Sequence, residues 1–183
     1  MSVMRQLLGS MKTRGAQSPS VIWHCDGGGA DLIYELSVAD FSVVRSAASP
    51  GATPYGIGGS RTVIWHCDAG TNRIYELSTL DFSVVRSAAS PGVIARGIGG
   101  DPNVIWHCDS FTDREYELST VDFSVVRFAA SPGADPFGTG GAFNVIWHCD
   151  FNTIRVYELS VVDFSVVRFA AAPTASPDGI GGK

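Results

Sequence analysis

The sequence is organised around a six-residue stretch, VIWHCD, that occurs four times, in residues 21–26, 63–68, 104–109 and 145–150. The four tryptophans lie 42, 41 and 41 residues apart, and each copy is followed by a YEL segment, a DFSVVR segment and a glycine-rich segment. A repeat of this period is typical of structural units that stack on one another, because one such unit is too small to bury a core alone. The repeat therefore constrains the fold more than any other feature of the chain.

Within one repeat, the apolar residues follow the two-residue period of β-strands. In the VIWHCD stretch the Val, Trp and Cys side chains point to one face, and the Ile, His and Asp side chains point to the other. In the second repeat, three more short strands are expected at residues 56–59, 73–78 and 82–89, separated by turns rich in Gly, Asn and Asp. Because both faces carry apolar residues, both are expected to be covered by neighbours. Four such antiparallel strands in each repeat predict the blade of a β-propeller.

The repeat thus predicts an all-β fold, a β-propeller of four four-stranded antiparallel blades of about 42 residues each. The propeller is expected at residues 19–183, after an N-terminal tail or short helix at residues 1–18. The four blades are expected at about residues 19–59, 60–100, 101–141 and 142–183.

Closure of the ring depends on the two ends of the repeat array. The first VIWHCD copy has no GIGG segment before it, whereas residues 179–182 supply one after the last blade. We expect residues 178–182 to pair with residues 21–26 as a C-terminal closing strand, which would leave no exposed sheet edge. Residues 14–17 (RGAQ) weakly resemble residues 96–99 (RGIG) and are a rival closing strand.

The repeat resembles the NHL-type β-propeller repeat. Pro54, Gly56, Ile57 and Asp68 stand at characteristic places of that repeat, and residues 72–74 (Asn-Arg-Ile) match its turn into the third strand. The resemblance covers about residues 19–182 and departs in GIGG for the usual GIAV and in HCD for the usual VAD. It implies a propeller that serves as a binding or scaffolding module, or in some members as an enzyme, so it does not select a function.

Composition and charge disfavour some partners and environments. A net charge of −5 and a pI near 5.2 argue against nucleic acid and anionic membranes, because both require a basic face. No apolar run approaches the roughly 18 residues of a membrane span, and no secretory signal is recognised. The four cysteines hold equivalent places in successive repeats, too far apart for disulfides. They are expected to be free buried thiols, compatible with the cytoplasm, and the localisation stays unknown.

The His-Cys-Asp triplet resembles a set of metal ligands, but neighbours in a strand point to opposite faces and cannot chelate one ion together. Stacked blades would bring Cys25 near His66, which offers two ligands where structural zinc usually has four. We therefore expect no metal, no cofactor and no catalytic residue, since four equivalent copies suit a structural role. Glu76 and Arg86, which also recur, are expected to pair across adjacent strands. The structural residues of VIWHCD are Trp23, Trp65, Trp106, Trp147, His24, His66, His107, His148, Asp26, Asp68, Asp109 and Asp150.

The loops differ between repeats and are the predicted ligand-binding sites, because binding residues are often carried on loops. The candidates are Tyr55, Arg96, Phe111, Phe137 and Phe151. Glu115 takes a place that is Ile or Val in the other three repeats, which distinguishes the third blade.

These features favour a non-enzymatic propeller that acts as a multivalent binding or structural module for a glycan or protein ligand. The alternatives are a propeller enzyme of the lactonase or lyase type, and a building block of a lattice or virion surface. The chain itself is a further expected partner. A homodimer that completes one ring is favoured over a four-blade monomer, and an open head-to-tail chain comes third.

Overall fold

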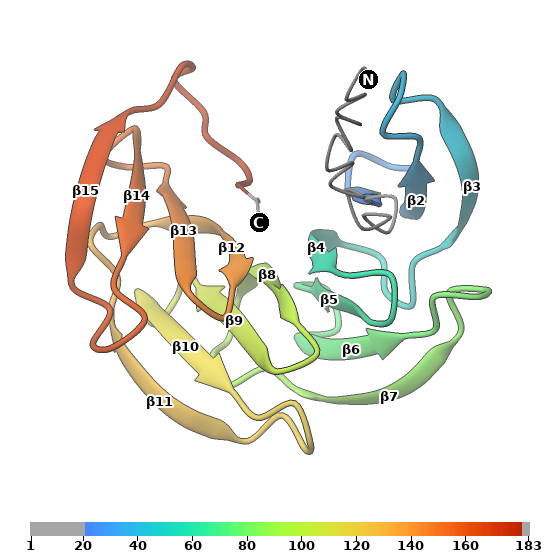
Figure 1. Cartoon of the computed structure of the whole chain (residues 1–183), viewed down its shortest axis with the longest axis horizontal. Helices are drawn as coiled ribbons and strands as arrows, with labels where there is room; N and C mark the ends of the chain where they lie inside the picture. Colours follow the sequence, from blue (N-terminus) through green and yellow to red (C-terminus); the bar gives the residue numbers. More distant parts are fainter. Residues whose placement is uncertain (1–20, 181–183) are drawn as a thin grey trace, which may run out of the picture.

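The computed structural model describes residues 21–180, and within this range all regular secondary structure is β-strand. Fifteen strands form four antiparallel sheets, which are the blades of a β-propeller and lie around a common centre (Figure 1). In each blade the spatial order of the strands is the order of the chain. The structure therefore confirms the all-β propeller fold that the repeat predicts.

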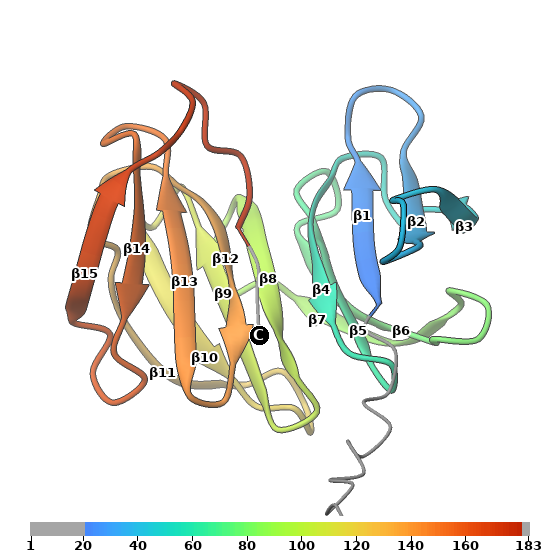
Figure 2. The ribbon, with the colours of Figure 1, turned by 45° about the horizontal axis from the view of Figure 1, so that its top comes forward.

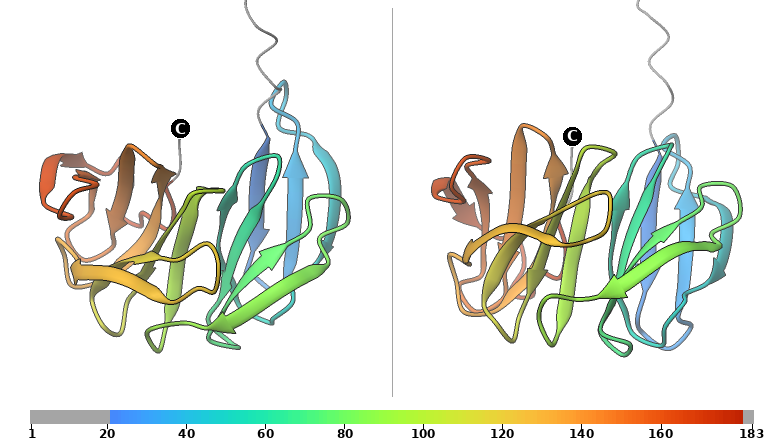
Figure 3. Two further views of the ribbon diagram at one scale, coloured as in Figure 1. Left: turned by 60° about the horizontal axis from the view of Figure 1, so that its bottom comes forward. Right: turned by 90° about the horizontal axis from the view of Figure 1, so that it is seen from below.

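The strands have the following bounds. Blade 1 consists of β1 (Ile22–Asp26), β2 (Leu32–Leu36) and β3 (Val43–Ala48). Blade 2 consists of β4 (Pro54–Gly59), β5 (Ile64–Asp68), β6 (Arg73–Leu77) and β7 (Val84–Ala89). Blade 3 consists of β8 (Ala95–Asp101), β9 (Val104–Asp109), β10 (Arg114–Leu118) and β11 (Val125–Ala130). Blade 4 consists of β12 (Pro136–Ala142), β13 (Val145–Asp150), β14 (Arg155–Leu159) and β15 (Val166–Ala171). In Figure 3, β7 (green) and β11 (yellow-orange) lie across the outer surface of their blades.

A tight turn before the last strand of each blade aims a phenylalanine at the neighbouring blade. In blade 2, Asp81 stabilises this turn by accepting hydrogen bonds from the backbone N of Ser83 at 3.1 Å and from its Oγ at 2.8 Å. Phe82 follows in the left-handed region, with φ of 62°, which is unusual for so large a side chain. Its ring is 5% exposed because it packs on Trp23 of blade 1.

Successive blades pack through contacts that we call seams, and the three seams use equivalent residues. In the seam between blades 2 and 3, the Trp65 indole meets Phe123 edge to face, with 5.9 Å between ring centres. Its Nε1 also donates a hydrogen bond to the carbonyl oxygen of Asp101 at 3.2 Å. Trp65 is only 2% exposed, so it is a central part of the core that this seam buries.

In blades 1 to 3, an ion pair near the outside of the blade reaches across the seam to the next blade. Arg86 Nε lies 2.5 Å from Glu76 Oε2, which confirms the predicted pairing across adjacent strands. The Arg86 guanidinium donates hydrogen bonds to the carbonyl oxygens of Thr120 and Val121 in blade 3, and lies 4.6 Å from the centre of the Phe123 ring. The ion pair therefore links two blades as well as two strands.

The four blades form an arc whose two ends do not pair (Figures 1 and 2). Within the described range blade 1 has three strands, and β1 has no partner strand on its inner side. Residues 173–180 form no strand and run beside β12: Cys149 Sγ donates to the carbonyl oxygen of Pro177 at 3.5 Å, and a Cβ on Gly138 would lie 2.8 Å from Gly179 Cα.

The described part of the predicted closing strand therefore does not pair with β1. Residues 176–180 pack on the preceding blade, as the inner strands β8 and β12 do, but blade 1 lies on the other side of the gap in the arc (Figure 1). Residues 1–18, with the expected tail and the rival closing strand at residues 14–17, lie outside the described residues.

Candidate functional site

The seams bury three histidines in equivalent surroundings. In His66, Nε2 is 3.1 Å from Ser49 Oγ, and Nδ1 is 2.8 Å from the carbonyl oxygen of Gly56. His107 has the same two partners, Ser90 and Gly97, at 3.0 and 2.8 Å. A main-chain carbonyl can only accept, so Nδ1 carries the proton and Nε2 accepts from the serine hydroxyl. These two histidines are therefore satisfied groups of the core.

His148 differs from them, because a carboxylate replaces the carbonyl as its partner. Its Nε2 lies 3.2 Å from Ser131 Oγ, whereas its Nδ1 lies 2.6 Å from Oε1 of Glu115, a close contact whose angles do not form a hydrogen bond. Both His148 and Glu115 are fully buried. Glu115 stands on β10 opposite Cys108, in the place that Ile33 and Ile74 hold in earlier blades. The seam between blades 3 and 4 thus contains a Ser–His–Glu arrangement.

The arrangement contains the parts of a base-activated nucleophile. A histidine that is oriented by a carboxylate at one nitrogen can accept a hydroxyl proton at the other nitrogen. Ser131 is half-buried on the loop from β11 to β12, and the backbone N–H of Gly133 lies 3.5 Å from its Oγ. Among the described seams, only this one has a carboxylate beside the histidine.

Sequence reasoning missed this group although one signal was present. The exchange of Ile for Glu115 marked the third blade as distinct. It did not reveal the partner, because His148 belongs to the next blade and meets Glu115 only through the packing of the two sheets. The repeated His and Asp residues also favoured a purely structural interpretation of every copy.

The cysteines beside the site remain protonated. Burial, followed by the charge of Glu115, raises the pKa of Cys149 to about 12, and the same two causes raise the pKa of Cys108 well above its usual value. All four cysteines are free, as the sequence predicts. Since the thiolate is the nucleophilic form, these thiols do not compete with the Ser131 hydroxyl.

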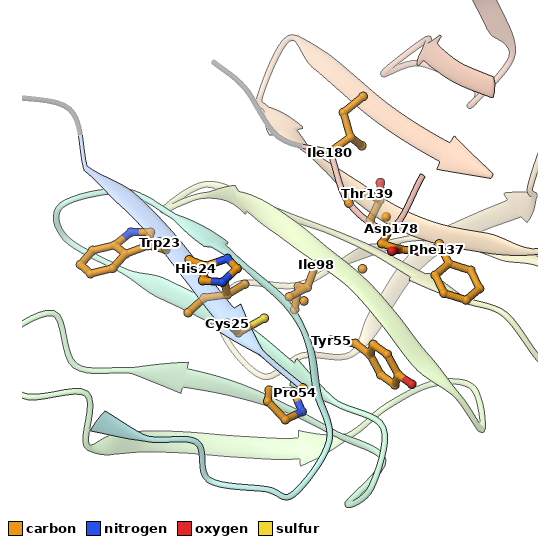
Figure 4. A pocket seen from close by; sticks show the side chains of 16 residues that line it. Trp23, His24, Cys25, Pro54, Tyr55, Ile98, Phe137, Thr139, Asp178 and Ile180 are labelled. Atoms are coloured by element: carbon orange, nitrogen blue, oxygen red, sulfur yellow. The ribbon is translucent and has the colours of Figure 1, made fainter. Parts of the chain in front are cut away.

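A second feature is a central cavity of about 620 Å³, into which β1, β4, β8 and β12 and the C-terminal segment all face. Figure 4 shows His24, Tyr55, Phe137, Thr139 and Asp178 around it. His24 is exposed here, whereas its equivalents in blades 2 to 4 are fully buried, because no inner strand covers β1 in the described range. The cavity therefore lies beside the open part of the arc.

Two of the five loop candidates, Tyr55 and Phe137, line this cavity, and Arg96 and Phe151 contact them. The Arg96 guanidinium lies 4.2 Å from the ring centres of both Tyr55 and Phe137, between the two. Phe137 also stacks on Phe151, with 5.2 Å between ring centres. Phe111 is 65% exposed on the turn after β9 and has no aromatic contact among those described. The candidates thus form one cluster and not a set of repeated sites.

The residues with predicted structural roles lie mainly in the seams. Trp65 and Trp106 are buried, and Trp23 and Trp147 are half-buried. Asp68 is fully buried, where Oδ2 accepts from the Thr53 backbone N at 2.7 Å and Oδ1 from Thr71 Oγ1 at 2.8 Å. The equivalents Asp109 and Asp150 are also buried, whereas Asp26 in blade 1 is half-buried.

Residues 21–180 contain no group of three or more His, Cys, Asp or Glu side chains placed to bind a metal ion. They also contain no helix with the length and apolar character needed to span a membrane.

The buried histidines make stability depend on pH. Burial lowers the pKa of His66 and of His107 from 6.5 to about 4. The unfolded chain therefore binds more protons than the folded chain between these values, and stability that is present above pH 6.5 is lost as the pH falls towards 4. We expect the free energy of unfolding, measured with urea, to decrease from about pH 6.5 to about pH 5, above the range where ordinary carboxylates titrate. A His66→Gln variant should show a shallower decrease, and a flat profile in the parent would contradict the burial of neutral histidines.

No protein-family model matches the chain, and no curated protein matches it. Solved structures share its fold. Glutaminyl cyclase from Myxococcus xanthus is 13% identical, with a TM-score of 0.67 over 83% of this chain and 72% of that one. Virginiamycin B lyase from Staphylococcus aureus is 19% identical, with a TM-score of 0.60 over 88% and 56%. A chain of a nidogen/laminin complex is 16% identical, with a TM-score of 0.68 over 88% and 63%.

These neighbours correct the expectation that the chain is not an enzyme. That expectation rested on the absence of a catalytic motif in the repeat, but both the cyclase and the lyase are enzymes built on this fold. The chain spans little more than half of the lyase, and its identity to each neighbour is too low to transfer an activity. No family is assigned by the comparisons, and the NHL type of the repeat stays a resemblance. The likeness establishes the fold, and the chain is a β-propeller.

Proposed function

We propose that this chain is a propeller hydrolase of ester or lactone bonds, with Ser131 as nucleophile, His148 as general base and Glu115 as the group that orients the imidazole. The observation that carries the proposal is the continuous contact from Ser131 Oγ through His148 to Glu115, at 3.2 and 2.6 Å. A lone buried histidine of the repeat needs no carboxylate, as His66 and His107 demonstrate with their carbonyl partners.

The chemistry follows from these three groups. Ser131 Oγ attacks the carbonyl carbon of the substrate while its proton passes to His148 Nε2. The bond from the carbonyl carbon to the leaving oxygen then breaks, and that oxygen takes the proton from His148. Water then attacks the acyl-serine and gives a proton to His148. The acyl–oxygen bond breaks, Ser131 Oγ takes back the proton, and the acid is released. Glu115 holds Nδ1–H and stabilises the imidazolium that forms in each half. The N–H of Gly133 lies beside Oγ as a donor for the developing negative oxygen.

The surroundings favour a single small substrate. The loop that carries Ser131 continues into β12, whose Phe137 and Thr139 line the central cavity. Phe137, Tyr55 and Arg96 form one stacked group there, which offers apolar surface and one cation. Because the loop candidates converge on this group, the geometry gives more support to one bound small molecule than to a repeated glycan or protein ligand.

A fluorophosphonate probe tests the proposal, because it forms a covalent bond only with an activated serine. We expect peptide mapping to locate the label on Ser131 and not on Ser49 or Ser90, which lie beside His66 and His107 without a carboxylate. These two serines are internal controls with the same local sequence. In a second assay, hydrolysis of p-nitrophenyl butyrate should also require Ser131.

The matched variants are Glu115→Ile, which restores the residue of blades 1 and 2, and Ser90→Ala, which removes an equivalent hydroxyl. Glu115→Ile should reduce labelling and hydrolysis by about 100-fold to 10,000-fold, the usual contribution of an oriented base. Ser90→Ala should leave both unchanged. Absence of labelling and hydrolysis in the parent, equal labelling of the three serines, or full activity in Glu115→Ile would each refute the proposal.

A further inference from the structure

The seams inside the chain consist of two complementary faces. The donor face of a blade carries the tryptophan and the arginine, and the acceptor face of the next blade carries the phenylalanine and the carbonyl groups of the turn before it. Between blades 1 and 2, Arg45 donates to the carbonyl oxygens of Thr79 and Leu80 and lies 4.5 Å from the centre of the Phe82 ring. Trp23 meets the same ring at 5.9 Å. The other two seams repeat this pattern.

One copy of each face is left unused at the ends of the arc. On blade 1, Phe41 is 70% exposed, whereas Phe82, Phe123 and Phe164 are 5–6% exposed. On blade 4, the Arg168 side chain is 71% exposed, whereas its equivalents are 30–32% exposed. Arg168 keeps its bond to Glu158, but among residues 21–180 no following blade offers it a carbonyl partner. The arc thus presents an acceptor face at one end and a donor face at the other.

We propose that the donor face of blade 4 docks on the acceptor face of blade 1 in a second copy of this chain. The contact would be a fourth seam of the same construction as the three within the chain, with Arg168 and Trp147 on Phe41. The two faces of one copy do not meet, because the ends of its own arc are apart (Figure 1). A second copy supplies the complementary face, so the donor face of one chain can dock on the acceptor face of another.

The unpaired inner edge of β1 also supports a second copy of the chain as the partner. β1 has no inner partner in the described range, and residues 177–180 form a surplus inner segment beyond blade 4. In blade 2, Pro54, Gly56 and Ile57 pair with Asp68, Cys67 and His66. The same register would pair Pro177 with Asp26, Gly179 with Cys25 and Ile180 with His24 of the second copy. This pairing would cover the exposed His24 and the edge of β1.

Thr174 marks a place where the proposed seam must differ from the other three. It stands in the place of Gly51, Gly92 and Gly133, where a Cβ would come within 2.0–2.3 Å of the carboxyl carbon of the aspartate in the next blade and would overlap with it. In two of those blades a threonine of the following turn donates to that aspartate, as Thr71 does to Asp68 and Thr112 to Asp109.

In blade 1 the corresponding turn is one residue longer, holds Gly27, Gly28 and Gly29, and has Ala30 in the place of the threonine. Asp26 accordingly has a different partner, the backbone N of Gly28 at 2.7 Å. The proposed seam would therefore place Thr174 beside an aspartate that is held differently from Asp68 and Asp109.

Native mass spectrometry and light scattering test the proposal on the full chain. The parent should have at least twice the 19.4 kDa of one chain. Phe41→Asp, which removes only the acceptor face, and Arg168→Glu, which removes only the donor face, should each be monomeric, with at least a tenfold weaker association. Both residues are exposed in the single chain, so both variants should keep the parent's β-sheet spectrum. Phe143→Asp, at 71% exposure on the turn after β12, is the control and should remain dimeric.

Mixing the two monomeric variants gives the sharpest result. Each retains the face that the other has lost, so a one-to-one complex should form in the mixture although neither variant associates alone. A parent of 19.4 kDa at all concentrations, a dimer that survives Phe41→Asp, or a mixture that stays monomeric would overturn the proposal. The labelling of Ser131 is measured separately, so failure of the interface leaves the proposed hydrolase intact, and the reverse also holds.

Discussion

Trp65→Ala is expected to lower the free energy of unfolding by about 3–5 kcal/mol, as large aromatic truncations in a packed core do. The indole is 2% exposed, packs edge to face on Phe123 and donates a hydrogen bond to the carbonyl oxygen of Asp101. Its removal leaves a cavity in the seam between blades 2 and 3 and one carbonyl without its donor. Urea denaturation followed by circular dichroism measures the loss.

Phe111→Ala is the control for this prediction. That side chain is also a large aromatic, but it is 65% exposed on a turn, so its removal should change stability by no more than about 0.5 kcal/mol. Equal losses for the two variants would show that the Trp65 seam is not the packed core of the propeller.

His148→Ala is expected to cost about 3–5 kcal/mol of stability, because it leaves the Glu115 carboxylate buried without its partner. His107→Ala is the matched control, since it leaves only the Gly97 carbonyl and the Ser90 hydroxyl, both neutral. The loss in His107→Ala should therefore be smaller. Thermal and urea unfolding at neutral pH compare the two variants.

Glu115→Ile should behave in the opposite way. Replacement of one member of a buried polar pair by an apolar residue is destabilising when it leaves a charge behind, but the His148 imidazole that remains can bond to the Gly138 carbonyl, as His66 bonds to Gly56. We expect stability within about 1 kcal/mol of the parent, or higher, since Ile already fills this place in blades 1 and 2. A loss as large as that of His148→Ala would show that the pair is needed for folding.

Together these variants separate stability from function. If Glu115→Ile is stable but no longer activates Ser131, the carboxylate is retained for chemistry and not for the fold. This outcome would agree with the general tendency of functional sites to depart from the most stable residue choice.

The sequence by itself determined the all-β propeller fold, the four blades and the strands within them. VIWHCD and YEL each alternate with a two-residue period, and DFSVVR follows a turn that Asp81 and its equivalents stabilise. These local patterns occur four times, and each repeat by itself predicts the same strands. The pairing of Glu76 with Arg86 could be predicted for the same reason, since adjacent strands of one hairpin bring them together.

The side-chain contacts between different blades could be seen only in the tertiary structure. Glu115 and His148 lie 2.6 Å apart because the sheets of blades 3 and 4 pack face to face, a relation that no spacing within one repeat contains. The convergence of Tyr55, Arg96 and Phe137 likewise results from three strands that meet near one axis. The failure of residues 176–180 to pair with β1 could not be predicted either, because it depends on how far the four blades carry the chain around the centre (Figure 1). Local pattern specifies which strand a residue joins, whereas the angle between blades specifies which residues of different repeats come into contact.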